Sequence, residues 1–451
     1  MKLIRLFDDR TFYKSLFAIA VPIMLQNLIS SLVNMAAIVM IGRLGTTEIA
    51  AVGLGNQVFF LLNMILFGVG SGATVFTAQY WGKGDVAGIR KNTGLSLIIV
   101  LSVAAAFTAL CVAAPRLVIG LYSNDANVID SGAAYLRSVA PSFLPFAVSF
   151  VFTLIMRTIE KVKLSMLTTA FSLGINVLLN YAFIFGVGPL PAMGVVGAAL
   201  ATIIARVIEM ALLVGISYGR KYALAGTVRL LFGFDAAFVR RFFQIALPVI
   251  LNELFWSLGI TMQSVIFART NTDAIAAFNI TNTVSQLTWV VFIGLGNGGA
   301  VLIGKKIGEG NESTARAYAA RLTLFAPLAA LFVGLWLVPI SAFLPRLFNV
   351  NANVLSIIAP MFIILTVVYP FRAFNMTMIV GVCRAGGDTV FSVLYDVLFM
   401  WTVSLPLAGL ASFAFHSPVW IIYLCITSED LLKMGIGLQR LRGGKWLRNV
   451  T

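Results

Sequence analysis

The sequence contains few charged residues, a single histidine and three cysteines. Only 11% of its 451 residues are charged, whereas 60% are hydrophobic and the mean hydropathy is +0.96. This composition excludes an ordinary water-soluble domain, in which about a quarter of the residues are charged. The lone His416 excludes a histidine-ligated metal centre. Cys111, Cys383 and Cys425 lack the spacing of a metal or disulfide site, so we expect buried free thiols.

Catalytic and nucleotide-binding motifs are also missing. There is no phosphate-binding loop, no metalloprotease motif and no nucleophile elbow. The glycine-rich stretch "GLGNGG" (Gly294 to Gly299) lies inside a long apolar run and has no strand before it, unlike a dinucleotide-binding loop. We therefore expect neither an enzyme nor a bound cofactor.

Long apolar runs dominate the chain instead. A helix needs about 20 apolar residues to cross a hydrocarbon layer about 30 Å thick. The sequence contains twelve such runs, the first at roughly 15–41 and the last at roughly 417–438. They predict an all-α polytopic membrane protein with twelve transmembrane helices.

Basic residues are distributed unevenly between the connections. Of the 32 Lys and Arg residues, only Arg43, Arg116, Arg269 and Arg346 fall in odd-numbered connections, whereas most others lie in the terminal tails and even-numbered connections. The positive-inside rule then puts both termini in the cytoplasm, and we expect a multi-pass protein of the plasma (inner) membrane of a prokaryote. Contact with anionic lipid explains the net charge of +15 without nucleic acid.

The sequence also repeats itself. A shift of 226 residues pairs Pro22 with Pro248, Arg43 with Arg269, Asn56 with Asn282, and the glycines at 68, 70 and 72 with those at 294, 296 and 298; a shift of 227 pairs Arg157 with Arg384. Repeats of six helices, an even number, share one orientation, so we predict two six-helix bundles related by a pseudo-two-fold axis along the membrane normal. We expect an N-lobe at 1–218, a basic cytoplasmic linker at 219–241 and a C-lobe at 242–451 with a basic tail.

Ionisable residues inside the apolar runs are costly and are functional suspects. Glu253 and Asp396 have no obvious cation nearby in the sequence. Because burial disfavours the charged form of a carboxylate, each is a candidate to bind a coupling proton or sodium ion. The alternative for each is a structural acid bonded across helices. Arg206 with Glu209, and Glu429 with Lys433, have the spacing of internal ion pairs on one helix.

Amide and aromatic side chains in the runs either join helices or contact a ligand. The candidates for a substrate cleft are Asn34, Gln57, Trp256, Gln263, Asn282 and Gln286. An aromatic such as Trp256 can stack on a cationic ligand, although packing in the core or against lipid is the commoner role. Apart from sodium, we expect no metal site.

The sequence resembles the multidrug and toxic compound extrusion (MATE) transporters along essentially its whole length. The resemblance is carried by "AVPIMLQNLISSLVN" (Ala20 to Asn34), "GRLGTTEIAAVG" (Gly42 to Gly53), "GSGATVFTAQYWGKGD" (Gly70 to Asp85), "MGVVGAALAT" (Met193 to Thr202) and "GGDT" (Gly386 to Thr389). It implies alternating-access export of cationic or amphiphilic small molecules in exchange for sodium ions or protons, by a chain that we expect to be a monomer surrounded by membrane lipid. A lipid-linked oligosaccharide flippase of the same superfamily is the alternative.

The first helix departs from the pattern of this family. Many such transporters carry an aspartate fifteen residues after the proline of this helix, where the present chain has Ala37. Other N-lobe positions of the family's cation site match Asn176, Asn180 and Thr202, which supply neutral oxygens. Three explanations stay open: coupling rests on C-lobe acids, with Glu253 ahead of Asp396; the chain is a natural or engineered uncoupled variant; or the substrate differs.

We expect Ala37→Asp to leave gradient-driven efflux unchanged, because the first explanation puts ion coupling in the C-lobe. The measurement is substrate efflux from proteoliposomes under an imposed sodium gradient and, separately, a proton gradient. Driven efflux that appears only in the aspartate variant would move the coupling site to the first helix.

Overall fold

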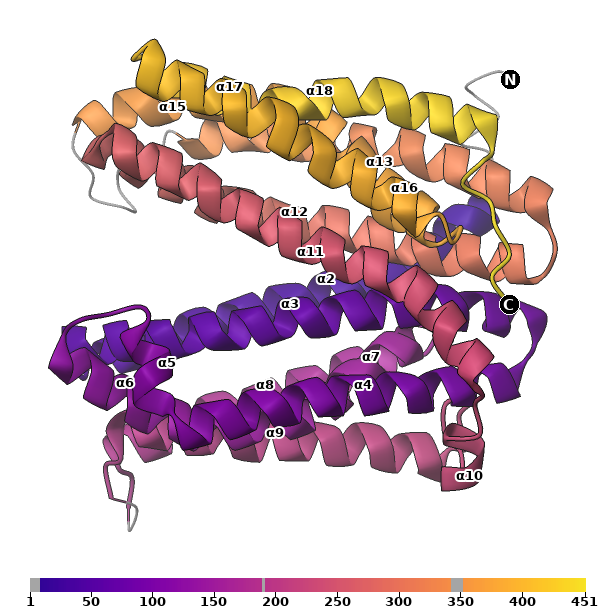
Figure 1. Cartoon of the computed structure of the whole chain (residues 1–451), viewed down its shortest axis with the longest axis horizontal. Helices are drawn as coiled ribbons and strands as arrows, with labels where there is room; N and C mark the ends of the chain where they lie inside the picture. Colours follow the sequence, from indigo (N-terminus) through magenta and orange to yellow (C-terminus); the bar gives the residue numbers. More distant parts are fainter. Residues whose placement is uncertain (1–8, 189–190, 342–351) are drawn as a thin grey trace. The chain divides into compact units, whose positions relative to one another are not determined.

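The computed structural model describes residues 9–188, 191–341 and 352–451, and Arg346 lies outside them. Within these ranges the chain is helical and contains no strand (Figure 1). This follows from the apolar composition, because a helix satisfies its backbone hydrogen bonds internally where no water is available. Cys111 and Cys383 are buried free thiols, and Cys425 is a half-buried one.

Eleven helices in the described ranges are long and apolar enough to cross a membrane. The long helices are α2 (Arg10–Gly42), α3 (Thr46–Lys83), α4 (Val86–Ala113), α6 (Ala126–Val139) continued by α7 (Phe143–Thr158), α8 (Val162–Phe185), α9 (Gly194–Gly219), α11 (Ala236–Thr270), α12 (Thr272–Gly308), α13 (Glu312–Ser341), α15 (Ala352–Met376) continued by η2 (Thr377–Arg384), and α16 (Thr389–Val393) continued to Ala414. The twelfth predicted span is α18 (Val419–Gly443), which is less apolar because it carries Glu429, Asp430 and Lys433. The prediction of an all-α, twelve-helix membrane protein is confirmed.

The span from Thr389 to Ala414 is not a regular α-helix. Three π-helical turns, η3 (Leu394–Leu398), η4 (Met400–Ser404) and η5 (Leu410–Ala414), alternate with α-helical segments, among them α17 (Leu405–Gly409). Wider turns of this kind occur often at functional sites. Asp396 lies in η3.

The internal repeat is visible in the helix boundaries. The helices α2 and α11 begin at Arg10 and Ala236, α3 and α12 at Thr46 and Thr272, α4 and α13 at Val86 and Glu312, and α6 and α15 at Ala126 and Ala352, so each pair begins 226 residues apart. Pro22 and Pro248 both lie inside the first helix of their half. The two halves of the sequence are therefore built from the same elements in the same order.

Packing divides the chain into two compact units. The N-terminal unit is Leu25–Phe243, and the C-terminal unit combines Gln244–Thr451 with the chain up to Met24. The start of α2 thus packs with the half of the sequence that follows the predicted linker, and α11 already begins inside that linker, at Ala236. A short helix, α10 (Val228–Leu231), lies in the linker as well.

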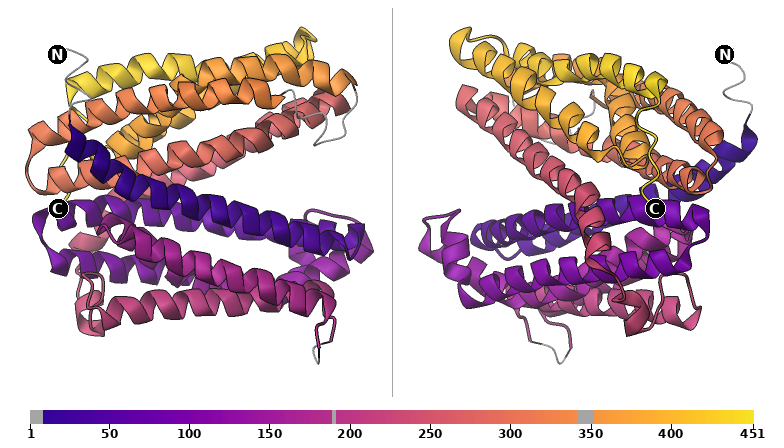
Figure 2. Two further views of the ribbon diagram at one scale, coloured as in Figure 1. Left: turned by 180° about the vertical axis from the view of Figure 1, so that it is seen from behind. Right: turned by 45° about the vertical axis from the view of Figure 1, so that its right-hand side comes forward.

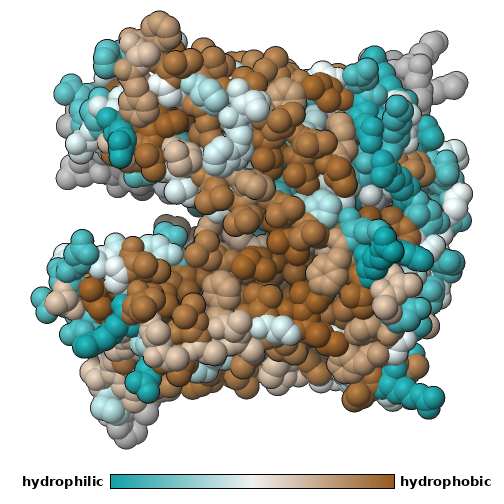
Figure 3. Space-filling view, viewed as in Figure 1, coloured by the Kyte–Doolittle hydropathy of each residue, from teal (hydrophilic) through white to brown (hydrophobic). Residues whose placement is uncertain are grey.

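Neighbouring helices lie side by side within each unit. In the N-terminal unit α8 runs along α9, and α3 packs on α4 and α6 (Figure 2). In the C-terminal unit α13 runs along α15, and α15 packs on α18. Hydrophobic side chains cover the middle of the helices on the face shown in Figure 3, and hydrophilic ones gather toward the helix ends. This is the pattern of a surface that faces hydrocarbon between two polar boundaries.

The segment after α18, Gly444–Thr451, folds back onto the turn between η2 and α16, and we call it the C-terminal tail. Its Trp446 is fully buried. The backbone N–H of Arg448 donates to the carbonyl of Gly386, at 2.8 Å. A Cβ on Gly386 would collide with the carbonyl of Trp446, so only glycine allows this approach.

The same turn holds a buried carboxylate between two arginines. Asp388 is 1% exposed, and its Oδ2 accepts from Arg440 at 2.5 and 2.8 Å while its Oδ1 pairs with Arg448 at 3.0 Å. Gly387 next to it has φ +76°, the left-handed region that glycine favours. The "GGDT" motif is therefore the site at which the C-terminal tail docks.

We expect Trp446→Ala to destabilise the protein by about 3–5 kcal/mol, because truncating a buried tryptophan removes its packing and leaves a cavity. The measurement is thermal unfolding of the purified protein in detergent. Lys445→Ala is the control, since Lys445 is exposed in the same segment. Equal unfolding temperatures for the two variants would contradict a packing role for the C-terminal tail.

Candidate functional site

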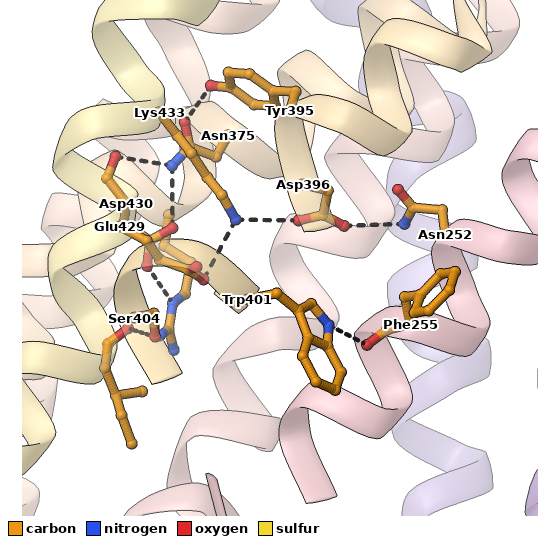
Figure 4. Close-up of polar contacts among 12 residues, drawn as sticks. Asn252, Phe255, Asn375, Tyr395, Asp396, Trp401, Ser404, Glu429, Asp430 and Lys433 are labelled. Atoms are coloured by element: carbon orange, nitrogen blue, oxygen red, sulfur yellow. Dashed lines mark hydrogen bonds and ion pairs between the residues drawn. The ribbon is translucent and has the colours of Figure 1, made fainter. Parts of the chain in front are cut away.

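The C-terminal unit contains a network of buried charged side chains, which we call the charge network (Figure 4). Its members are Arg372 of α15, Asp396 of η3, and Glu429, Asp430 and Lys433 of α18. The Nζ of Lys433 lies 3.3 Å from Asp396 Oδ1 and 3.3 Å from Glu429 Oε1. On the other side of Asp396, its Oδ2 accepts from the amide of Asn252 in α11, at 3.0 Å. One lysine thus links two carboxylates on two helices, and the amide extends the link to a third.

A second branch of the charge network contains Asp430. Its Oδ2 accepts from Arg372 Nε at 3.1 Å, and its Oδ1 accepts from Asn375 Nδ2 at 3.0 Å. Asn375 is fixed in turn, because its Oδ1 accepts from the hydroxyl of Tyr395 at 2.6 Å. Both oxygens of Asp430 are therefore engaged, and one of their two partners, Asn375, is itself fixed by a further hydrogen bond.

Burial makes the charge of this network energetically important. The exposed fractions of the side chains are 3% for Lys433, 9% for Glu429, 9% for Asp430, 14% for Asp396 and 22% for Arg372. Three carboxylates face two cations, so with every group ionised the network carries one negative charge in excess. An uncompensated charge in such surroundings is costly.

Glu253 has no obvious cation nearby in the sequence, but in the structure it pairs with an arginine of another helix. Its Oε1 accepts from Arg384 Nη2 at 2.8 Å, and the arginine is 4% exposed. Asp396 likewise pairs with Lys433 of another helix, so both acids are bonded across helices, the alternative stated for each. The cations come from helices distant in the sequence, with Arg384 131 residues from Glu253, so inspection of neighbouring residues could not find them.

The N-terminal unit has a chain of polar contacts at the corresponding place. Arg157 donates to Gln26 at 2.6 Å, and Gln26 donates to Thr169 at 2.8 Å. Thr169 donates to Glu209 at 2.8 Å, and Glu209 pairs with Arg206 at 2.8 Å. The predicted ion pairs Arg206–Glu209 and Glu429–Lys433 are both confirmed.

The two sets of contacts occupy equivalent positions of the repeat. The shifts of 226 and 227 residues pair Gln26 with Asn252, Thr169 with Asp396 and Arg157 with Arg384. The amide-to-hydroxyl contact of one half is an amide-to-carboxylate contact in the other. In the N-terminal chain of contacts two arginines face one glutamate, so its excess charge is positive, opposite to that of the charge network.

The predicted N-lobe coupling residues are only partly brought together. Asn180 donates to Asn176 at 3.0 Å, and both are buried on α8. The hydroxyl of Thr202 donates to the carbonyl of Ala198 in its own helix, at 2.9 Å. Ala37 is half-buried in α2.

The six predicted cleft residues show a range of exposure. Asn34, Gln57 and Gln286 are exposed, Trp256 and Asn282 are half-buried, and Gln263 is buried. Asn252 and Arg384 are absent from the predicted set of site residues. The repeat contained a signal for both, because Asn252 follows Pro248 as Gln26 follows Pro22, and Arg384 matches Arg157.

Comparison with known proteins agrees with this architecture. The MatE family model matches residues 22–182 and 248–410, one segment in each half. The "Probable multidrug resistance protein NorM" of Thermotoga maritima is 25% identical over 97% of this chain and 94% of that protein. The "Multidrug resistance protein MdtK" of Edwardsiella ictaluri is 24% identical over 87% of this chain and 86% of that protein.

A solved structure has the same fold. It is described as the "outward-facing conformation of a multidrug resistance MATE family transporter of the MOP superfamily", and it superposes with a TM-score of 0.84 at 20% identity over 99% of both chains. With the family model matched in both halves, the chain belongs to the MatE family. It is a multi-pass membrane transporter and not an enzyme.

We expect Glu253→Gln and Arg384→Gln to destabilise the protein by about 3–5 kcal/mol each, because each leaves one buried charge without its partner. The double variant should recover most of the loss, since it removes both charges. Thermal unfolding in detergent measures the effect. Replacing the exposed pair Glu312 and Arg316 in the same way is the control, expected to change stability by about 0–1 kcal/mol. If the stability loss of the double variant equals the sum of the two single losses, Glu253 and Arg384 do not act as a structural ion pair.

Proposed function

We propose that the protein exports cationic or amphiphilic small molecules across the plasma membrane of a prokaryote by alternating access, in exchange for protons or sodium ions. The observation that carries this proposal is the match to the MatE family in both halves of the chain. The names of its relatives support the substrate class, since they are multidrug resistance proteins. The distribution of Lys and Arg supports cytoplasmic termini.

Ion coupling in this proposal rests on acids of the C-terminal unit. Ala37 in α2 has no group that binds a cation, whereas Glu253 and Asp396 are buried or nearly buried carboxylates. An exchanger needs a group whose affinity for the ion differs between its two states. Asp396 suits this role better than Glu253, because Asp396 shares Lys433 with a second carboxylate, whereas Glu253 forms its ion pair with the buried Arg384.

The excess negative charge of the charge network also suits a cationic substrate. A site that is one positive charge short binds either a coupling ion or a positively charged molecule more readily than both together. Binding of one then favours release of the other, and this competition is what an exchange cycle requires.

We expect Asp396→Asn to reduce gradient-driven efflux by about 5- to 150-fold, the range of common coupling free energies, because the variant removes the carboxylate that shares Lys433 with Glu429 and with it the excess negative charge of the network. Glu253→Gln should keep driven efflux in the fraction that folds. The measurement is efflux of a fluorescent quaternary ammonium dye from proteoliposomes, under a proton gradient and under a sodium gradient. The proposal fails if the unaltered protein moves no dye under either gradient. Loss in Glu253→Gln with full activity in Asp396→Asn would reverse the order of the two acids.

A further inference from the structure

We propose that the coupling ion is a proton and that its binding site is Glu429 in α18. This inference deepens the function proposed above and rests on it for the link to transport. The proton site itself rests on four features of the charge network: an oxygen without a partner, the charge of the groups around it, the position of Lys433 and the path of contacts to α11.

Glu429 is the acid of the charge network that has a vacant oxygen. Asp396 uses one oxygen for Lys433 and the other for Asn252, and Asp430 has both oxygens engaged. Glu429 Oε1 pairs with Lys433, but Oε2 is buried and has no hydrogen-bond partner among the described residues. A buried carboxylate oxygen without a donor is costly, and a proton bound there removes the charge that causes the cost.

The groups around Glu429 carry a net negative charge together with it. The charged ones are Lys433 and Asp430 on its own helix, Asp396 on η3 and Arg372 on α15. The neutral titratable ones are Tyr369 on α15, Tyr395 on η3 and Tyr423 on α18, all buried in the same region. Because three carboxylates face two cations, uptake of one proton brings the network to neutrality.

The position of Lys433 favours a proton over sodium. Its ammonium group lies 3.3 Å from both Asp396 and Glu429, so it occupies the space where a metal ion bridging these carboxylates would sit. A sodium ion and a proton add the same charge, but a sodium ion needs a space among several oxygens that the ammonium group already fills, whereas a proton needs only the vacant oxygen.

Protonation changes how the helices are joined. With Glu429 neutral, Lys433 is attracted to Asp396 alone, and the pair between α18 and η3 strengthens. Asp396 also accepts from Asn252, whose own Oδ1 is buried and has no partner among the described residues. Two contacts, Lys433 with Asp396 and Asp396 with Asn252, therefore connect the charge on α18 to α11. The helix α11 is the first helix of its half and contains Pro248.

Infrared difference spectroscopy on the purified, substrate-free protein tests the site. Acidification should produce the C=O band of a protonated carboxylic acid that is absent in Glu429→Gln. The band should remain in Glu209→Gln, the matched control, because both oxygens of that buried acid already accept from Thr169 and Arg206. Sodium added at constant pH should leave the band unchanged.

Three results would overturn the proposal. They are a band that persists in Glu429→Gln, a band that disappears in Asp396→Asn but not in Glu429→Gln, and a band that sodium removes. If Glu429→Gln does not fold, Glu429→Asp replaces it, and a band at unaltered frequency in that variant excludes Glu429. The spectra are recorded without substrate, so the two proposals can fail separately. If the band is lost in Glu429→Gln but the unaltered protein moves no dye under either gradient, the proton site stands and the transport function is rejected.

Discussion

The cost of an unpaired charge away from water is the constraint on which most of this structure depends. The helices form because the backbone must satisfy its own hydrogen bonds in hydrocarbon. The charged side chains then need partners from other helices, as Glu253 finds Arg384 and Asp430 finds Arg372. Where acidic and basic side chains are equal in number, the ion pair joins two helices and stabilises their packing. Where they are unequal, as around Lys433, a place remains at which an ion can act.

The two halves show how one scaffold acquired different chemistry. Both place an arginine of the fourth span against the first helix of the repeat, Arg157 on Gln26 and Arg384 on Glu253. Both connect the first helix to the fifth span through an amide. Exchange of Thr169 for Asp396 at that position turns a neutral contact into a charged one, and the excess charge changes sign between the halves. Divergence of a few polar residues was enough, because the helix geometry was kept.

Much of the fold was predictable, and less of the site. Spans, repeat and the pairs Arg206–Glu209 and Glu429–Lys433 follow from periodicity, since residues three or four apart share a helix face. The pair Glu253–Arg384 does not, because it depends on which helices pack together. Nor does the early start of α11, where apolar and basic residues alternate without a clear boundary. The importance of Glu429 appears only when the partners of each carboxylate oxygen in the charge network are compared, because Glu429 Oε2 has none among the described residues.

The docked C-terminal tail has a consequence for biosynthesis. The ribosome makes Asp388 52 residues before Arg440 and still longer before Arg448. During that interval the carboxylate has neither arginine, and the turn that carries it must stay in contact with water. Only after α18 has been inserted can the arginines arrive and the turn become dry. The order of translation therefore makes docking of the C-terminal tail on this turn a late step of assembly. A last helix that stalls or inserts wrongly would leave the tail undocked.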